Sequence, residues 1–142
     1  MATTKSTTVD KTQAISLVDN FLEQFQAVCN QPSPAKASDL DKWLSQNLQV
    51  TSNGNVVDRS LQDYINRIGK MKSKYSRIEI QDRLEEPIVS DNKVVVNYDA
   101  VLTGKNNQAV TVNIMAIATV DNNKISRWTQ VANQKGTGNW DS

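Results

Sequence analysis

The 142-residue chain contains no histidine, and this absence limits the chemistry that its side chains can perform. Ser-His-Asp and Cys-His nucleophile arrangements, histidine acid/base catalysis and most zinc sites all depend on that residue. The single cysteine, Cys29, falls on the apolar side of an expected helix, where a thiol behaves as a small hydrophobic group. Any catalysis must therefore use carboxylates, tyrosine, lysine or amides, and the sequence predicts neither a metal ion nor a cofactor.

The clustered charges do not suggest a catalytic group. Glu85 and Glu86 are adjacent, so on a strand they would point to opposite sides and could not cooperate. Five basic residues crowd the end of a predicted helix: Arg67, Lys70, Lys72, Lys74 and Arg77. Because the helix macrodipole favours positive charge at a C-terminus, we interpret this cluster as a solvated face rather than as an anion site.

Composition limits the partners and the location that we expect. The chain has 16 Lys and Arg against 15 Asp and Glu, and a net charge of +1 gives no field that would gather nucleic acid. It contains no apolar run long enough to cross a bilayer, so no membrane is expected as a partner. The expectation is a single cytoplasmic domain.

The first half of the chain has the periodicity of helices. Apolar residues recur at three- and four-residue steps over 13–30, which predicts an amphipathic helix with Asp10 at its start. Prolines that follow this segment should end it. A second, shorter helix is expected to begin at Ser33 or Ser38 and to run to Gln46.

A hairpin and a third helix complete the N-terminal part. Residues 48–58 predict a small hairpin, because Asn53 and Gly54 accept the positive φ angles of a tight turn. Ser60 and Asp63 form a capping box, and apolar residues continue a helix from there to about Lys74.

From Tyr75 onward the apolar residues alternate, which is the period of a strand. Four successive strands are expected, over 78–84, 94–102, 110–120 and 125–132. Helices followed by hairpin-linked strands predict an α+β fold in which the N-terminal helices pack on a curved antiparallel sheet. The expected organisation is a disordered segment over 1–12, one domain over 13–133 and a loose tail over 134–142.

The order of these elements, which ends in the strand pair VDNNKISRWTQVAN, resembles the nuclear transport factor 2-like (NTF2-like) superfamily and its SnoaL-like branch. The resemblance is one of pattern and spans roughly residues 12–133. It implies a cone, in which the sheet curls around a pocket that the helices partly close. Members include ketosteroid isomerases, polyketide cyclases, scytalone dehydratases, epoxide hydrolases and non-enzymatic binders, so the fold names no function.

The catalytic residues of these enzymes are largely missing. The resemblance places the isomerase general base at Ser52 and its oxyanion-binding carboxyl at Ala116, and neither side chain can do that work. Scytalone dehydratase chemistry depends on histidine. The epoxide hydrolase relay needs Asp-Arg-Asp, and although Asp99 and Arg127 are present, alternation directs both to the convex side.

The same register predicts which side chains face the pocket. The strand residues expected on the concave face are Val96, Tyr98, Ala100, Val112, Ile114, Ala116, Ala118, Trp128, Gln130 and Ala132. The expected ligand-binding residues are Trp43, Tyr64, Tyr98, Trp128 and Gln130, although each aromatic could equally be a core residue. Asp58, which could lean over the pocket mouth, and Tyr98 are the candidates for a catalytic role.

Three functions remain open. The first hypothesis is a binder of a small, largely apolar molecule, and the second is an isomerase, cyclase or dehydratase with an unusual acid/base set. The third is a protein-interaction or dimerisation module whose pocket is filled by side chains. A homodimer is expected in any case, because apolar residues such as Met115, Ile117 and Val131 lie on the convex face of the sheet.

Overall fold

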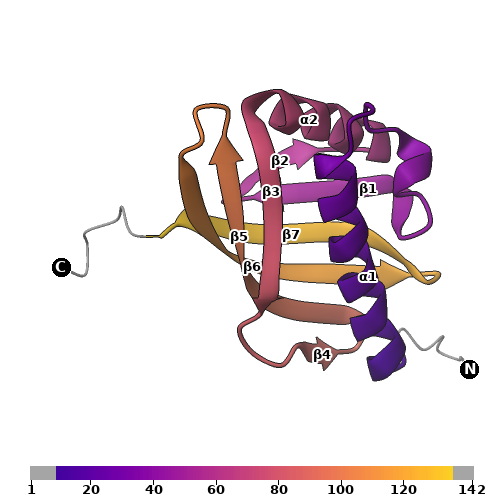
Figure 1. Cartoon of the computed structure of the whole chain (residues 1–142). Helices are drawn as coiled ribbons and strands as arrows, with labels where there is room; N and C mark the ends of the chain where they lie inside the picture. The colour runs from indigo at the N-terminus through magenta and orange to yellow at the C-terminus, as the bar shows by residue number, and fades with distance from the viewer. Residues whose placement is uncertain (1–8, 136–142) are drawn as a thin grey trace, which may run out of the picture.

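A computed structural model describes residues 9–135 of the chain. Its elements in chain order are α1 (Lys11–Asn30), a short 3-10 helix (Ala37–Asp39), β1 (Leu44–Ser52), β2 (Asn55–Asp58), α2 (Leu61–Lys74), β3 (Tyr75–Arg83), β4 (Ile88–Ser90), β5 (Lys93–Gly104), β6 (Ala109–Asp121) and β7 (Lys124–Gln134). The sheet curls from β3 through β5 and β6 to β7 and β1, and α1 covers the side left open (Figure 1). The predicted α+β fold, with helices on a curved sheet, is confirmed.

The sheet is mixed rather than purely antiparallel. Its strand order is β2-β1-β7-β6-β5-β3, with β4 paired to β5, and β1 runs parallel to β7 while the other pairs are antiparallel. A parallel pair needs a long crossover, and the segment from β2 to β6 supplies it. Because alternation shows only which side chains share a face, the direction of a distant partner strand could not be predicted.

The predicted turn and caps form as the residues require. Asn53 and Gly54 have φ values of 50° and 87°, which suits the tight turn between β1 and β2. Asp10 Oδ1 accepts the backbone N–H of Gln13 at 2.9 Å, and Ser60 Oγ accepts that of Asp63 at 3.0 Å. Each cap satisfies a helical N–H that would otherwise have no partner.

The second predicted helix does not form. Only Ala37–Asp39 make a 3-10 turn, and β1 already begins at Leu44, which pairs with Ile125 of β7. The backbone N–H of Ile125 donates to the Trp43 carbonyl at 2.8 Å. Leu40 and Leu44 are still buried, because the four-residue spacing that predicted a helix also carries two leucines inward through a turn and a strand start. Pairing with β7 therefore overrides the local periodicity.

The ends of the elements differ slightly from the predicted ones. Helix α1 begins at Lys11, two residues before the predicted start, and β7 continues to Gln134. Strand β4 follows Pro87 and was not predicted as a separate element. The predictions for the termini concern mainly residues 1–8 and 136–142, which lie outside the described residues. None of the helices over residues 9–135 is long and apolar enough to span a bilayer.

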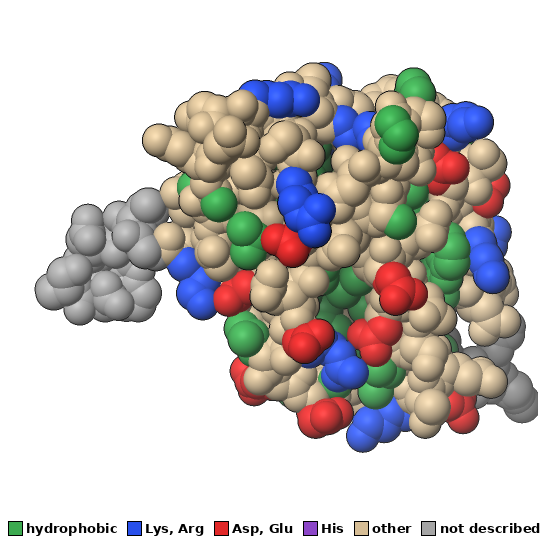
Figure 2. Space-filling model, in the orientation of Figure 1, with side chains coloured by type: hydrophobic (Ala, Val, Ile, Leu, Met, Phe, Trp, Pro, Cys, Tyr) green, Lys and Arg blue, Asp and Glu red, His purple; other side chains and the backbone are tan. Residues whose placement is uncertain are grey.

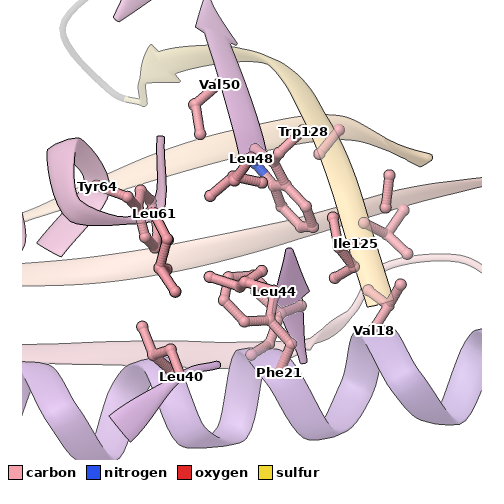
Figure 3. Close-up of a cluster of buried hydrophobic side chains, with 14 of the residues drawn as sticks. Val18, Phe21, Leu40, Leu44, Leu48, Val50, Leu61, Tyr64, Ile125 and Trp128 are labelled. Atoms are coloured by element: carbon pink, nitrogen blue, oxygen red, sulfur yellow. The ribbon is translucent and has the colours of Figure 1, made fainter. Parts of the chain in front are cut away.

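One part of the concave interior is closely packed. Its side chains come from α1, from the turn before β1, and from β1 and β7, and they point into the space between these elements (Figure 3). The most enclosed are Val18, Leu40, Leu44, Leu48 and Ile125, none of them more than 1% exposed. We call this group the packed core. It holds α1 against the sheet.

Side-chain amides of α1 hold the edge strand β3. Asn30 donates to the Ile78 carbonyl at 2.7 Å and accepts the Ile78 N–H at 2.9 Å, and Gln26 accepts the Ile80 N–H at 2.6 Å. These amides bind backbone groups that a further strand would otherwise bind, so they protect the sheet edge. Lys72 of α2 donates to carbonyls at the end of α1, those of Val28 and Gln31, so it does not belong to a solvated face as the sequence suggested.

Candidate functional site

A cavity of about 170 Å³ lies beside the packed core, between the concave sheet face and the helices. Seven of the residues expected on the concave face line it, namely Tyr98, Ala100, Val112, Ile114, Trp128, Gln130 and Ala132. The others, Val96, Ala116 and Ala118, are buried away from it. Residues from α1, α2 and β3 complete the lining: Phe21, Leu22, Phe25, Tyr64, Arg67, Met71, Ile78 and Ile80, with Leu102 of β5.

A cluster of four aromatic rings lines the cavity, three of them on helices and the fourth, Trp128, on β7. The ring centres of Phe21 and Trp128 are 5.3 Å apart in an edge-to-face arrangement, and those of Phe25 and Tyr64 are 6.2 Å apart. Phe21 lies 6.4 Å from Tyr64 and so joins the two pairs. The sequence did not single out Phe21 and Phe25, because phenylalanines four residues apart on an apolar helix face are typical of an ordinary core.

A short chain of hydrogen bonds fixes the polar groups of β7. The indole N–H of Trp128 donates to Gln130 Oε1 at 2.9 Å, and Gln130 Nε2 donates to Ser52 Oγ at 3.2 Å. Ser52 lies directly opposite Gln130 in the β1–β7 register. Since an indole N–H can only donate, it determines which end of the Gln130 amide faces it. These groups are therefore ordered, and they have the chemistry of hydrogen-bonding groups rather than of a base.

Two tyrosines that line the cavity have hydroxyls without a hydrogen-bond partner among residues 9–135. Tyr98 is 3% exposed and Tyr64 is 9% exposed, and neither hydroxyl bonds to any residue over 9–135. Every fully enclosed side-chain polar atom in that range has a partner, so both hydroxyls must be reachable from the space beside them. Burial raises the pKa of both phenols well above the ordinary value, with Arg67 opposing the effect at Tyr64. Both groups are thus neutral hydrogen-bonding groups near pH 7.

Asp58 is bound by Arg67 and does not lean over the cavity. Its carboxylate is 2% exposed, and Oδ2 accepts from Arg67 Nη2 at 2.8 Å and from Nε at 2.9 Å. The Arg67 guanidinium also lies 5.4 Å from the Tyr64 ring centre. Arg67 lines the cavity and Asp58 does not, so the interpretation of Arg67 as a solvated residue is wrong. The sequence could not show this pair, which depends on how β2 meets α2.

Trp43 lies away from the other predicted site residues. It sits beside the N-terminal half of α1, in a shallow depression that Leu17 and Val120 also line, with the Lys42 ammonium 5.4 Å from its ring. Its expected position depended on the helix that does not form. The structure therefore brings together Tyr64, Tyr98, Trp128 and Gln130, and separates Trp43 from them.

An acidic groove adjoins the cavity between α1 and β3. Asp19 and Glu23 of α1 line it, together with Asp82, Glu85 and Glu86, and Arg83 is its one basic residue among those described. Figure 2 shows acidic side chains around a hollow with a hydrophobic floor at this place. Leu22, Ile80 and Tyr98 line both the groove and the cavity, which therefore share a wall. The groove measures about 640 Å³.

The convex face carries a separate polar network. Asp99 accepts from Asn113 at 2.9 Å and from Lys135 at 2.8 Å, and these bonds lower the pKa of its carboxyl. Asp99 therefore lies on the convex face, away from the cavity, as predicted. Arg127 is exposed. Around this network Met115, Ile117 and Val131 are 38–50% exposed.

No protein-family model matches the chain, and no curated protein matches it. Solved structures, in contrast, do match the fold of this chain. A SnoaL-like polyketide cyclase from Jannaschia Sp. CCS1 has a TM-score of 0.70 at 13% identity, covering 92% of this chain and 91% of its own. An NTF2-like protein from Anabaena variabilis has a TM-score of 0.70 at 10% identity, covering 98% and 99%. An LEH-like epoxide hydrolase from M. tuberculosis has 0.69 at 17%, covering 86% and 84%.

These likenesses define an α+β cone in which helices close one side of a strongly curved sheet. More specifically, the chain has the NTF2-like fold, as the pattern of its sequence suggested. Sequence identities of 10–17% to these three structures bear on the fold alone. What this chain does must be argued from its own cavity.

Proposed function

We propose that this protein binds a small, largely apolar molecule in the cavity between the concave sheet face and the helices. The observation that carries the proposal is a mostly apolar, aromatic-lined space that Tyr64 and Tyr98 also line, each with a hydroxyl that bonds to no residue over 9–135. Because these hydroxyls are accessible from the space beside them, a ligand with one hydrogen-bonding group could bind them in place of water while its apolar part fills the cavity.

The size of the cavity limits the ligand. A volume of about 170 Å³ is close to the roughly 150 Å³ known to hold a benzene molecule in an engineered protein cavity. The buried part of the ligand should therefore be about one aromatic ring. The rings of Phe21, Phe25 and Trp128 would contact its faces and edges.

We infer that binding, rather than proton transfer, is the principal activity. No carboxylate within residues 9–135 lines the cavity, and the nearby carboxylate of Asp58 is held by Arg67. Tyr98 could donate a hydrogen bond to a carbonyl. Its raised pKa keeps the phenol protonated near neutral pH, so almost no phenolate is present to act as a base. An epoxide hydrolase and a SnoaL-like polyketide cyclase share the fold, so an enzyme with an unusual acid/base set is the second candidate.

Binding is tested by NMR titration of the labelled protein with 4-methylphenol, which has one ring and one hydroxyl. We expect chemical-shift changes confined to the cavity, centred on Ala100, Ile114 and Trp128. A Tyr98→Phe variant, which keeps the ring and removes the hydroxyl, should weaken binding several-fold. The matched control is Tyr75→Phe, since Tyr75 lies outside the cavity. Shift changes scattered over the surface, or none at all, would contradict the proposal.

We also propose that the convex face joins a second copy of the chain. Met115 and Val131 are neighbours in the β6–β7 register, and with Ile117 they form an exposed apolar patch among amide and hydroxyl side chains. Such a surface suits a self-complementary interface. Sedimentation equilibrium should give a dimer, and Met115→Lys should give a folded monomer. A wild-type monomer would contradict this part of the proposal and favour an interaction with another protein.

A further inference from the structure

The acidic groove forms where the amide bonds from α1 to β3 end, just after Ile80. Amides of α1 bind β3 as far as Ile80, and a bulge follows, since Ile80 pairs with Ala100 whereas Arg83 pairs with Tyr98. Between these two pairs, two residues of β3 lie opposite one residue of β5. A bulge of this kind bends the strand. Beyond it the edge of β3 is no longer bound to α1 by these amides, and the groove lies between them beside Tyr98.

The groove has an uncompensated negative charge. Arg83 forms a two-point ion pair with Asp19, with Nε to Oδ1 at 3.2 Å and Nη2 to Oδ2 at 3.4 Å, which accounts for the groove's basic residue. Four carboxylates, those of Glu23, Asp82, Glu85 and Glu86, have no ion-pair partner within residues 9–135. The chain as a whole is nearly neutral, so this excess is a property of the groove.

Tyr98 is a second feature of this place, independent of the carboxylates, that suits a ligand. Its side chain is only 3% exposed, its hydroxyl has no partner among residues 9–135, and it lines both the groove and the cavity. A molecule that filled the cavity and extended past this hydroxyl would reach the carboxylates. Arg67, the cationic group of the cavity, is already bound by Asp58, so it does not cancel the field of the groove.

We propose that the ligand is an aralkylamine: one ring in the cavity and, on a short chain, a protonated amine among the groove carboxylates. This inference rests on the proposed binding function and specifies its ligand class. The carboxylates attract the ammonium group and raise its local concentration, while Tyr98 offers its hydroxyl oxygen as an acceptor at the junction. Because the carboxylates are exposed, their attraction should weaken as salt is added.

The test compares three probes of equal length: 4-phenylbutylamine, 4-phenylbutan-1-ol and 4-phenylbutanoate. Isothermal titration calorimetry at low ionic strength should show that the amine binds about five- to tenfold more tightly than the alcohol and that the carboxylate binds most weakly. A difference of this size is expected for several exposed charges acting together. In 0.5 M NaCl the amine and the alcohol should differ by less than about twofold.

A double variant, Glu23→Gln with Glu86→Gln, should bring the amine close to the alcohol and leave the alcohol unchanged. The control, Asp41→Asn with Glu79→Gln, changes net charge equally outside the groove and should keep the preference. If no probe binds, the binding function itself fails. If the three bind equally, or the carboxylate binds best, the cavity binds but the amine proposal is overturned.

Discussion

The concave interior has two halves that share one sheet face and one helix but differ in how completely they are filled. In the packed core, leucines from the turn before β1 meet α1 and β7, and Leu40 and Leu44 are at most 1% exposed. In the other half, which we call the hollow half, the small residues Ala100 and Ala132 line a cavity of about 170 Å³. Trp128 and Phe21, whose ring centres are 5.3 Å apart, line the cavity where it meets the packed core.

If the proposed function holds, this difference assigns stability mainly to the packed core and binding to the hollow half. Interiors are close-packed as a rule, so a cavity forgoes dispersion contacts that filled space would supply. The packed core provides burial that holds the helix on the sheet, and the hollow half is then free to keep its space. The comparison implies that equal substitutions in the two halves will have unequal consequences.

The largest difference should follow truncation of a leucine. Leu44→Ala should lower the free energy of unfolding by about 2–5 kcal/mol, because it opens a new cavity in filled space. Leu102→Ala, which enlarges a cavity that already exists, should cost clearly less. Urea denaturation followed by circular dichroism measures both. Equal losses would mean that the hollow half is as important for stability as the packed core.

Enlarging a small residue should again cost more stability in the packed core than in the hollow half. Ala118 is fully buried in the packed half, opposite Val94 and Trp128, so Ala118→Leu should destabilise by about 1–3 kcal/mol through overpacking. Ala100→Leu extends into the cavity and should change stability by less than about 1 kcal/mol, in either direction.

The same Ala100→Leu variant should abolish binding of 4-methylphenol, because its side chain occupies the ligand's space. Denaturation and NMR titration of the two alanine variants form a matched test of the comparison. A strongly destabilised Ala100→Leu protein would indicate that the cavity is not free to accept a side chain, and retained binding would place the ligand elsewhere.

The sequence predicted the parts of the fold that depend on local pattern. The period of residues 13–30, the cap at Ser60 and the turn at Asn53 each depend on groups a few residues apart, and all three form. Alternation along β5, β6 and β7 also predicted which side chains share a face, and the family resemblance supplied which of the two faces is concave.

What the sequence missed depends on partners far along the chain. Leu44 begins a strand because Ile125 pairs with it, and Arg67 enters the site because Asp58 binds it. The acidic groove needs a bulge opposite Tyr98, which no spacing in a single strand reveals. Alternation combined with the family resemblance could therefore predict that Tyr98 and Trp128 face inward, but not that a cavity would be left between them.

The smallest expected effect concerns Cys29, a buried residue of α1 that lies near Tyr64 but does not line the cavity. The thiol is buried, and burial raises its pKa from 9.0 to about 12, with Lys72 opposing the effect. Since the thiolate is the reactive form, its fraction at pH 8 should be about a thousandfold below that of an ordinary thiol. Native protein should therefore resist iodoacetamide at pH 8 and react promptly in urea.

The sign of the pH effect follows from the same shift. The raised pKa means that the folded state favours the neutral thiol. The contribution of Cys29 to the free energy of unfolding is therefore fully present below pH 9.0 and is lost as the pH rises toward about 12. Cys29→Ala should remove that part of the alkaline loss, which denaturation curves at pH 8 and pH 11 would show. Rapid labelling of the native protein, slowed by added 4-methylphenol, would instead reveal that the hollow half opens and that the ligand closes it.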